Sequence, residues 1–244
     1  MTGARRPVLR RVLACGLAAV ALLLGGCIYL RLLELKLQLG DFDRNFTIQT
    51  EDGLALILRD PVLRADDVRW IGLRPETIQR DGATERWQVR WVKQLPPGVS
   101  EPVAYDLALD LGFAGGRLAR VAVPEKYFAA MPKDFAANLI RSVGRGRVDH
   151  AARRLDATVG SGPAVALRPR LPALGKLLGV PTEQRIEGAE TMTRYRYRPV
   201  TSEPGAAEFE MTLHFDTASG ELLRWRGRTP VGNLGFNFPP PAAP

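Results

Sequence analysis

Arginines occupy alternate positions in two segments near the end of the chain, residues 194–198 and 224–228. Alternate side chains of a β-strand point to the same side, so each set would line one face of a sheet. Guanidinium groups bind phosphate and carboxylate groups through paired, charge-assisted hydrogen bonds. The sequence therefore gives four candidate residues for holding an anionic lipid, lipopolysaccharide or peptidoglycan: Arg194, Arg196, Arg224 and Arg226.

A second interpretation of these arginines is mutual neutralisation. Between the two sets lies a segment, residues 208–216, that presents Glu208, Glu210 and Asp216. Opposite charges that face each other across strands stabilise a sheet by roughly 0.2–1 kcal/mol per pair. Mutual neutralisation is the favoured interpretation, because exposed charges are mostly solvated. Binding of an anion by the arginines is the alternative.

Other residue types offer no catalytic or metal-binding constellation. The two histidines, His150 and His214, are far apart in sequence and have no second histidine or carboxylate at ligand spacing. No nucleophile elbow, Ser-x-x-Lys pair or phosphate loop occurs. The acids at Asp66 and Asp67 fit the start of a helix, where the helix dipole favours them. We therefore expect no enzymatic activity, no cofactor and no metal.

The elements that would position the arginines follow from apolar periodicity. A short helix at residues 64–71 precedes strands at 85–93, 104–113 and 117–123, and a helix at 171–178 precedes strands at 193–199, 208–216 and 221–228. Alternation places five side chains inward, against helices: Trp91, Leu109, Tyr197, Leu213 and Trp225. The predicted fold class is α+β, with two tandem modules, each of short helices packed on a three-stranded antiparallel meander.

The two modules align at an offset of roughly one hundred residues, a repeat length that corresponds to whole small domains. We expect a first module at residues 42–130, a helical connection at 131–170 and a second module at 171–236. The connection would contain helices at 132–143 and 148–159. A Pro-rich tail, residues 237–244, is expected to be loose and polyproline-like.

The second module resembles a known family in its order of motifs. Residues 178–181 (Leu-Gly-Val-Pro) end a short helix, Tyr195 and Tyr197 lie on the next strand, and Gly220 makes the last turn. This order is similar to that of the SmpA/OmlA (BamE) type of outer-membrane lipoprotein. The resemblance implies helices on a three-stranded sheet and an accessory role in assembling β-barrel proteins. The glycine-led motif that precedes the second helix of that family is missing, so its partner-binding residues have no counterparts here.

The N-terminus has the residue pattern of an export signal. Four arginines, at positions 5, 6, 10 and 11, precede an uncharged apolar segment that ends in Leu24-Gly25-Gly26-Cys27. This pattern resembles the lipobox of bacterial lipoproteins, in which the cysteine thiol is diacylated and the chain is cleaved before it. It predicts a signal peptide at residues 1–26, lipidation of Cys27 and a leucine-rich tether at 27–41. The alternative is one membrane-spanning helix over residues 12–30, with the body in the periplasm in either case.

Charge and cysteine content limit the partners. The 244-residue chain has a net charge of +8, but the four N-terminal arginines account for half of it, and the remainder is only mildly basic. That excess does not suit a nucleic-acid binder. Apart from Cys27 the only cysteine is Cys15, so we expect no disulfide. The sequence predicts a non-enzymatic scaffold or accessory protein on the periplasmic face of the outer membrane. Its expected partner is an envelope protein, and the sequence does not indicate an oligomeric state.

Overall fold

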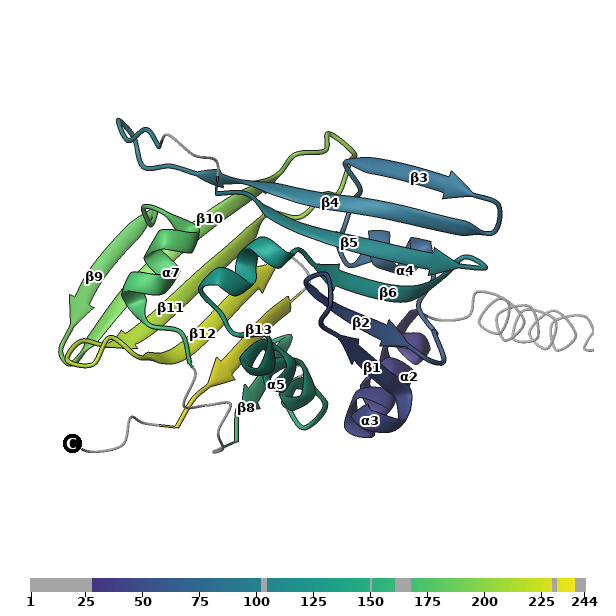
Figure 1. The fold of residues 1–244 in the computed structure, drawn as a ribbon, viewed down its shortest axis with the longest axis horizontal. Coiled ribbons are helices and arrows are strands. Elements are labelled where there is room, and N and C mark those ends of the chain that lie inside the picture. Colours follow the sequence, from purple (N-terminus) through teal and green to yellow (C-terminus); the bar gives the residue numbers. More distant parts are fainter. Residues whose placement is uncertain (1–27, 102–104, 150, 161–167, 230–231, 240–244) are drawn as a thin grey trace, which may run out of the picture.

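A single curved β-sheet runs through the chain (Figure 1). The structure is a computed structural model and describes residues 28–101, 105–149, 151–160, 168–229 and 232–239. Its helices are α2 (Ile28–Gly40), α3 (Phe42–Asn45), α4 (Ala65–Trp70), α5 (Lys133–Gly144) and α7 (Leu171–Leu178), with a 3-10 helix at Glu125–Ala129.

The described part of the chain contributes thirteen strands to this sheet. The strands of the first half are β1 (Phe46–Gln49), β2 (Leu54–Leu58), β3 (Thr77–Asp81), β4 (Thr84–Gln94), β5 (Leu107–Ala114) and β6 (Arg117–Val123). Those of the second half are β7 (Arg147–Asp149), β8 (Arg154–Thr158), β9 (Glu183–Glu187), β10 (Glu190–Pro199), β11 (Phe209–Asp216), β12 (Leu222–Thr229) and β13 (Gly232–Asn237). The order is β1-β2-β6-β5-β4-β10-β11-β12-β13-β8-β7, and β3 and β9 also pair with β4 and β10. Only β13 and β8 are parallel within these residues.

The predicted division into two tandem modules is wrong, because β4 and β10 pair directly and make the sheet continuous. Near its start β4 pairs with β3, but its last residues pair with the end of β10, from Trp91 opposite Pro199 to Gln94 opposite Arg196. A three-stranded meander would leave these strand ends as open edges, and exposed edges tend to find partners. Here each half covers the open edge of the other. The described meanders have four strands (β3 to β6) and five strands (β9 to β13) instead of three.

The sequence repeat nevertheless has a counterpart in the backbone. In the first half Leu118 N donates to Leu63 O over 2.8 Å, and in the second half Leu222 N donates to Pro169 O over 3.2 Å. In each half a short helix, α4 or α7, is followed by a glycine in the left-handed region and then by an antiparallel meander. The repeat is therefore real, but its two copies form one sheet.

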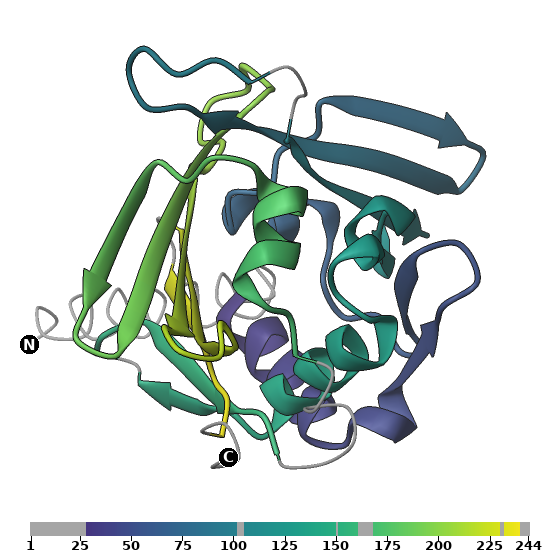
Figure 2. The same ribbon diagram turned by 60° about the vertical axis from the view of Figure 1, so that its left-hand side comes forward.

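The helices lie in the concavity of the sheet, as Figure 2 shows for α7, α5 and α2. One apolar core joins side chains from both halves, including Val68, Phe135, Leu174, Trp87 and Tyr195. Fully burying a side chain of this kind contributes about 1.5–3 kcal/mol. The predicted strand faces are confirmed. Trp91, Tyr197 and Leu213 are buried, and Leu109 and Trp225 pack against the same core.

Two further expectations are wrong near the middle and the end of the chain. Residues 148–159 form the hairpin β7–β8 instead of a helix, because Leu155 and Ala157 lie in β8, which pairs with β13. The start of the Pro-rich tail is not loose, since Phe238 is buried and stacks on Phe135 with ring centroids 5.5 Å apart. Residues 240–244 lie outside the described part of the chain.

Candidate functional site

The predicted arginines lie on the outer, solvent-facing side of β10 and β12. Tyr195 and Tyr197 point into the core, so alternation turns Arg194 and Arg196 outward. β11 lies between the two arginine strands, with Glu210 paired to both Arg196 and Arg228 in register. The outer face is therefore a ladder of arginines on either side of an acidic strand.

Arg194 and Arg196 share the carboxylate of Glu210. The Nε of Arg196 lies 3.0 Å from Glu210 Oε2, and the Nε of Arg194 lies 3.7 Å from Glu210 Oε1. Arg194 also donates from Nη1 to Glu183 Oε2 on β9 over 2.8 Å. Strand β9, which sequence reasoning missed, thus brings a second acid to this face. Both arginines are engaged by neighbouring carboxylates.

Arg224 is engaged at the other end of the ladder. Its guanidinium pairs with Glu190, whose Oε2 lies 3.3 Å from Nδ1 of His214. Burial lowers the pKa of His214 below its usual 6.5, and repulsion by Arg224 adds to the effect. His214 is therefore mostly neutral at pH 7. With an arginine against its ring, this histidine is poorly placed to bind a cation.

Arg226 holds the neighbouring strand in place. Its guanidinium donates to the carbonyl of Phe236 over 3.1 Å and to Oδ1 of Asn237 over 2.7 Å, both on β13. Burial lowers the pKa of Arg226 from its usual 12.5, and attraction by Asp156 opposes this. The side chain stays charged at neutral pH. Of the four predicted anion-binding arginines, three are ion-paired and the fourth makes structural hydrogen bonds.

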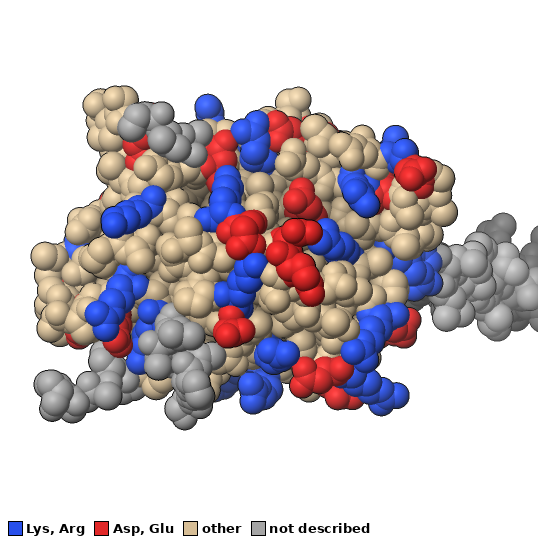
Figure 3. All heavy atoms as spheres, in the orientation of Figure 1, with Lys and Arg blue, Asp and Glu red and all other residues tan. Residues whose placement is uncertain are grey.

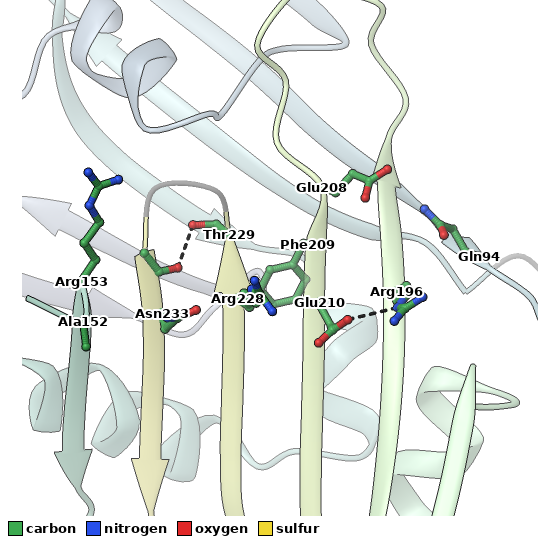
Figure 4. A pocket seen from close by; sticks show the side chains of 11 residues that line it. Gln94, Ala152, Arg153, Arg196, Glu208, Phe209, Glu210, Arg228, Thr229 and Asn233 are labelled. Carbon is green, nitrogen blue, oxygen red and sulfur yellow. Dashed lines mark hydrogen bonds and ion pairs between the residues drawn. The ribbon is translucent and has the colours of Figure 1, made fainter.

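An open hollow of about 500 Å³ lies on this outer face, where strands β10 to β13 begin or end (Figure 4). Its charged lining residues are Arg153, Arg196, Glu208, Glu210 and Arg228. Within the described ranges Arg153 and Arg228 form no ion pair with any acid. Arg228 is exposed, and in Figure 4 it lies between Asn233 and Glu210. The hollow therefore contains two arginines whose donors are free for a ligand.

Arg153 reaches this place through a turn that sequence reasoning missed. It ends the β7–β8 turn with a φ of 47°, in the left-handed region that residues other than glycine seldom adopt. Its carbonyl accepts a hydrogen bond of 2.8 Å from Asn233 N on β13, which fixes the turn beside the hollow. Sequence reasoning missed Arg153 because it predicted a helix over residues 148–159, where the structure has the β7–β8 hairpin. Arg228, by contrast, belongs to the alternation that the sequence displays.

A buried ion pair between Lys93 and Glu101 links the two halves of the sheet. The ammonium of Lys93 lies 2.6 Å from Glu101 and donates to the carbonyl of Leu178, at the end of α7, over 2.7 Å. Burial lowers the pKa of Lys93, and the Glu101 carboxylate opposes this. Cations are favoured at helix C-termini, so Lys93 caps α7 from the neighbouring repeat. All its donors face protein partners, which indicates a structural role.

Charged side chains elsewhere are mixed in sign. On the face seen in Figure 3, acidic and basic side chains lie interspersed over the surface. Among the residues that the structure describes, no three histidine, cysteine or acidic side chains are grouped so that they could hold a metal ion. The predicted signal peptide at 1–26, Cys27 and His150 fall outside the described residues.

Comparison with known proteins gives no relative. No family model matches the chain, and no curated protein and no solved structure is significantly similar to it. The resemblance to the SmpA/OmlA type therefore stays a prediction from the sequence. None of the described helices has both the length and the apolar character needed to cross a membrane.

Proposed function

We propose that the chain is an envelope lipoprotein, held at the periplasmic face of the outer membrane by acyl chains on Cys27, and that it acts without catalysis as a scaffold or accessory binding protein. The observation that carries this proposal is Leu24-Gly25-Gly26-Cys27 after a basic and then apolar segment. It is supported by the position of α2, whose described residues follow Cys27 directly in sequence and pack on the folded body. The anchor would thus lead directly into a fixed helix.

Intact-mass measurement of the membrane-extracted protein tests the anchor. We expect a mature chain that begins at Cys27 and carries acyl groups, and we expect Cys27→Ala to block both cleavage and acylation. A chain that retains Met1 and no acyl mass would instead support the alternative, a periplasmic domain held in the inner membrane by one helix. Separation of the two membranes by density would show which one holds the protein.

The partner is proposed to be another envelope protein. Crosslinking in native membranes, followed by affinity purification, tests this part of the proposal. We expect the same partner to be recovered with the wild-type chain and lost with Cys27→Ala, because the anchor brings the body to its site of action. Recovery of the body alone in every crosslinked sample would contradict the scaffold role.

The hollow supports a second candidate function, the binding of an anionic headgroup. The specific observation is that Arg153 and Arg228 line it without an acidic partner among the described residues. Charge-assisted hydrogen bonds contribute about 1.5–3 kcal/mol each where they are shielded, and much less where they are exposed. The predicted arginines that are already ion-paired would contribute less.

Calorimetry with the soluble phosphoglycerol headgroup of phosphatidylglycerol tests this second function. The double change Arg153→Gln and Arg228→Gln should weaken binding about tenfold, equivalent to about 1.4 kcal/mol. The matched control changes two ion-paired arginines, Arg194→Gln and Arg224→Gln, and should leave binding nearly unchanged. An equal effect of both double changes would show that only overall charge matters and would exclude a site in the hollow.

A further inference from the structure

Apolar side chains are exposed along one side of α2. Tyr29, Leu30, Leu33 and Leu37 are 65%, 64%, 52% and 68% exposed, and we call these four residues the α2 stripe. Trp70, at the end of α4, is 47% exposed and contacts Tyr29 edge to face, with ring centroids 5.7 Å apart. Among the described residues these five account for most of the large apolar side chains that are exposed. Contiguous exposed apolar surface of this kind marks a site of interaction.

The opposite side of α2 is fixed to the body, so the stripe cannot turn inward. Leu32 and Leu35 pack against the main core. Arg31 donates from Nε and Nη2 to the two carboxylate oxygens of Asp67, over 2.6 Å each, and Asp67 is buried in α4. At the far end of α2, a Cβ on Gly144 of α5 would overlap the carbonyl of Leu39. The helix is therefore apolar on two sides, and only one side has a partner within the described chain.

The position of α2 in the chain identifies what meets the stripe. Ile28, the first described residue of α2, follows Cys27 in sequence, so an acylated Cys27 would lie next to the stripe, and the alternative spanning helix over residues 12–30 would reach its first residues. The stripe is about 12 Å long at 1.5 Å per residue, so all of it lies close to that anchor. With either anchor in a membrane, the nearest surface for these side chains would be the lipid.

The composition of the surface also suits a lipid interface. Tyr29 and Trp70 have amphipathic rings of the kind enriched at the level of lipid headgroups. Lys36 and Glu34 flank the stripe on its two sides, and both are exposed. An apolar helix face bordered by charged residues is typical of a helix that lies in the interface plane. In Figure 1, α2 lies on the side of β1 and β2 and away from β9 and β10.

We propose that the α2 stripe and Trp70 dock on the lipid surface next to the anchor and hold the body in one orientation on the membrane. This inference rests on the proposed function, because the anchor brings α2 to the lipid. With α2 in the interface plane, a flexible tether is replaced by a rigid contact. The second half of the sheet, with its hollow, is then held in a fixed position relative to the membrane.

Quenching of tryptophan fluorescence by brominated acyl chains tests the docking. The full chain is reconstituted in phosphatidylcholine vesicles with and without bromine on the acyl chains. Of the four tryptophans, Trp87 and Trp91 are buried and Trp225 packs against the core, which leaves Trp70 as the exposed reporter. We expect brominated lipid to quench the wild type and to have little effect on Trp70→Phe.

A second pair of variants tests the stripe. Leu33→Glu with Leu37→Glu should reduce the quenching of Trp70, because charged side chains would hold α2 away from the acyl region. The control, Glu34→Gln with Lys36→Gln on the same helix, should retain it. Circular dichroism of both variants checks folding, which should be preserved because all four positions are exposed.

The outcomes separate this inference from the proposed function. Acylated, vesicle-bound protein whose Trp70 is not quenched would overturn the docking and leave the lipoprotein assignment intact. If that protein also has twice the expected mass, a second copy covers the stripe instead. Protein that carries no acyl mass and does not float with vesicles would overturn both. Quenching that is equally strong in Trp70→Phe would also overturn the docking.

Discussion

Arg194 pairs with Glu210 across β10 and β11, with 3.7 Å between Nε and Oε1, and one repeat earlier Arg90 makes the equivalent pair with Asp106, over 2.7 Å. A second acid holds each of these arginines, Glu183 for Arg194 and Glu76 for Arg90. Arg196, two residues further along β10, pairs among the described residues with Glu210 alone, and its backbone N donates to Oγ1 of Thr182. Arg196 therefore keeps guanidinium donors free toward the hollow, whereas Arg90 and Arg194 are each held by two carboxylates.

This difference predicts the effect of adding an acid beside Arg196. Thr182→Glu should give Arg196 a second carboxylate, as Arg194 and Arg90 have, and the added negative charge should weaken binding of the phosphoglycerol headgroup. Calorimetry on the wild type and the variant measures the change. Thr182→Val is the control, because it removes the hydroxyl without adding charge, and it should bind like the wild type. Unchanged binding by Thr182→Glu would place the anion elsewhere.

Asp67 should be important for stability through its contact with Arg31. Asp67→Asn removes the carboxylate from a largely buried ion pair, and loss of one partner of such a pair costs roughly 3–5 kcal/mol. Burial raises the pKa of Asp67, but hydrogen bonds from Arg31 and Arg64 outweigh it and hold the pKa below the usual 3.8. The pair's contribution is therefore present above about pH 4 and is lost as the pH falls through the lowered pKa.

Urea unfolding at pH 7 and at pH 3 measures this contribution. The difference between the wild type and Asp67→Asn should shrink at the lower pH, because protonation of Asp67 removes the pair from the wild type too. Asp66→Asn is the matched control, since Asp66 is the neighbouring acid and makes no ion pair with another described residue. A constant difference at both pH values would contradict the prediction.

Leu213 tests the assignment of the inner face. It is 3% exposed in the main core, and Leu213→Ala should lower the free energy of unfolding by roughly 2–5 kcal/mol through the cavity that it leaves. The same change at Leu33, which is 52% exposed, should cost less than about 0.5 kcal/mol. Chemical denaturation of both variants gives the comparison. Equal losses would mean that the inner and outer faces are wrongly assigned.

Lys93 should couple the two halves of the sheet. Lys93→Met leaves the Glu101 carboxylate buried and frees the end of α7, so we expect a loss of roughly 3–5 kcal/mol. Removing both charges, with Lys93→Met and Glu101→Gln, should cost less than the sum of the two single changes. Hydrogen exchange should quicken at Gly179 and Val180 in Lys93→Met. Additive losses would indicate that the two side chains act separately.

The sequence revealed the strands that have one buried face. In β10 and β11 the buried residues Tyr195, Tyr197 and Leu213 alternate with charged or polar ones, so period and face could be read together. β3 and β9 were missed because both of their faces are polar and mostly exposed. The pairing of β4 with β10 is made by backbone hydrogen bonds between distant segments, which leave no periodic signal.

The candidate site divides in the same way. Arg228 could be found because it belongs to the alternating arginines of β12, and so could Glu210 on β11, which pairs with Arg194 and Arg196. The acids Glu183 and Glu190, which hold Arg194 and Arg224, were missed. Arg153 could not be found, since its position depends on the β7–β8 turn and on the parallel pairing of β8 with β13. In residues 148–159 the apolar positions also fit a helical period, and only tertiary contacts decide between helix and hairpin.

His214 predicts a loss of stability in mild acid. Its folded pKa is lowered, chiefly by burial, so between that value and about 6.5 the unfolded chain binds more protons than the folded chain. Stability then falls as the pH decreases from about 6.5, by at most about 1.4 kcal/mol per pH unit for one proton. Protonated His214 would also lie against Arg224, whose Nη2 is 3.3 Å from Nδ1.

Urea midpoints for the wild type and His214→Gln between pH 7.5 and pH 5 measure this dependence. The variant should have the shallower slope, because glutamine keeps a polar side chain on β11 and does not titrate. His150→Gln is the control and should keep the slope of the wild type, since the dependence arises from the partly buried ring of His214 beside Arg224. If the wild type instead becomes more stable as the pH is lowered from 7.5 to 5, attraction by Glu190 outweighs burial and raises the pKa of His214.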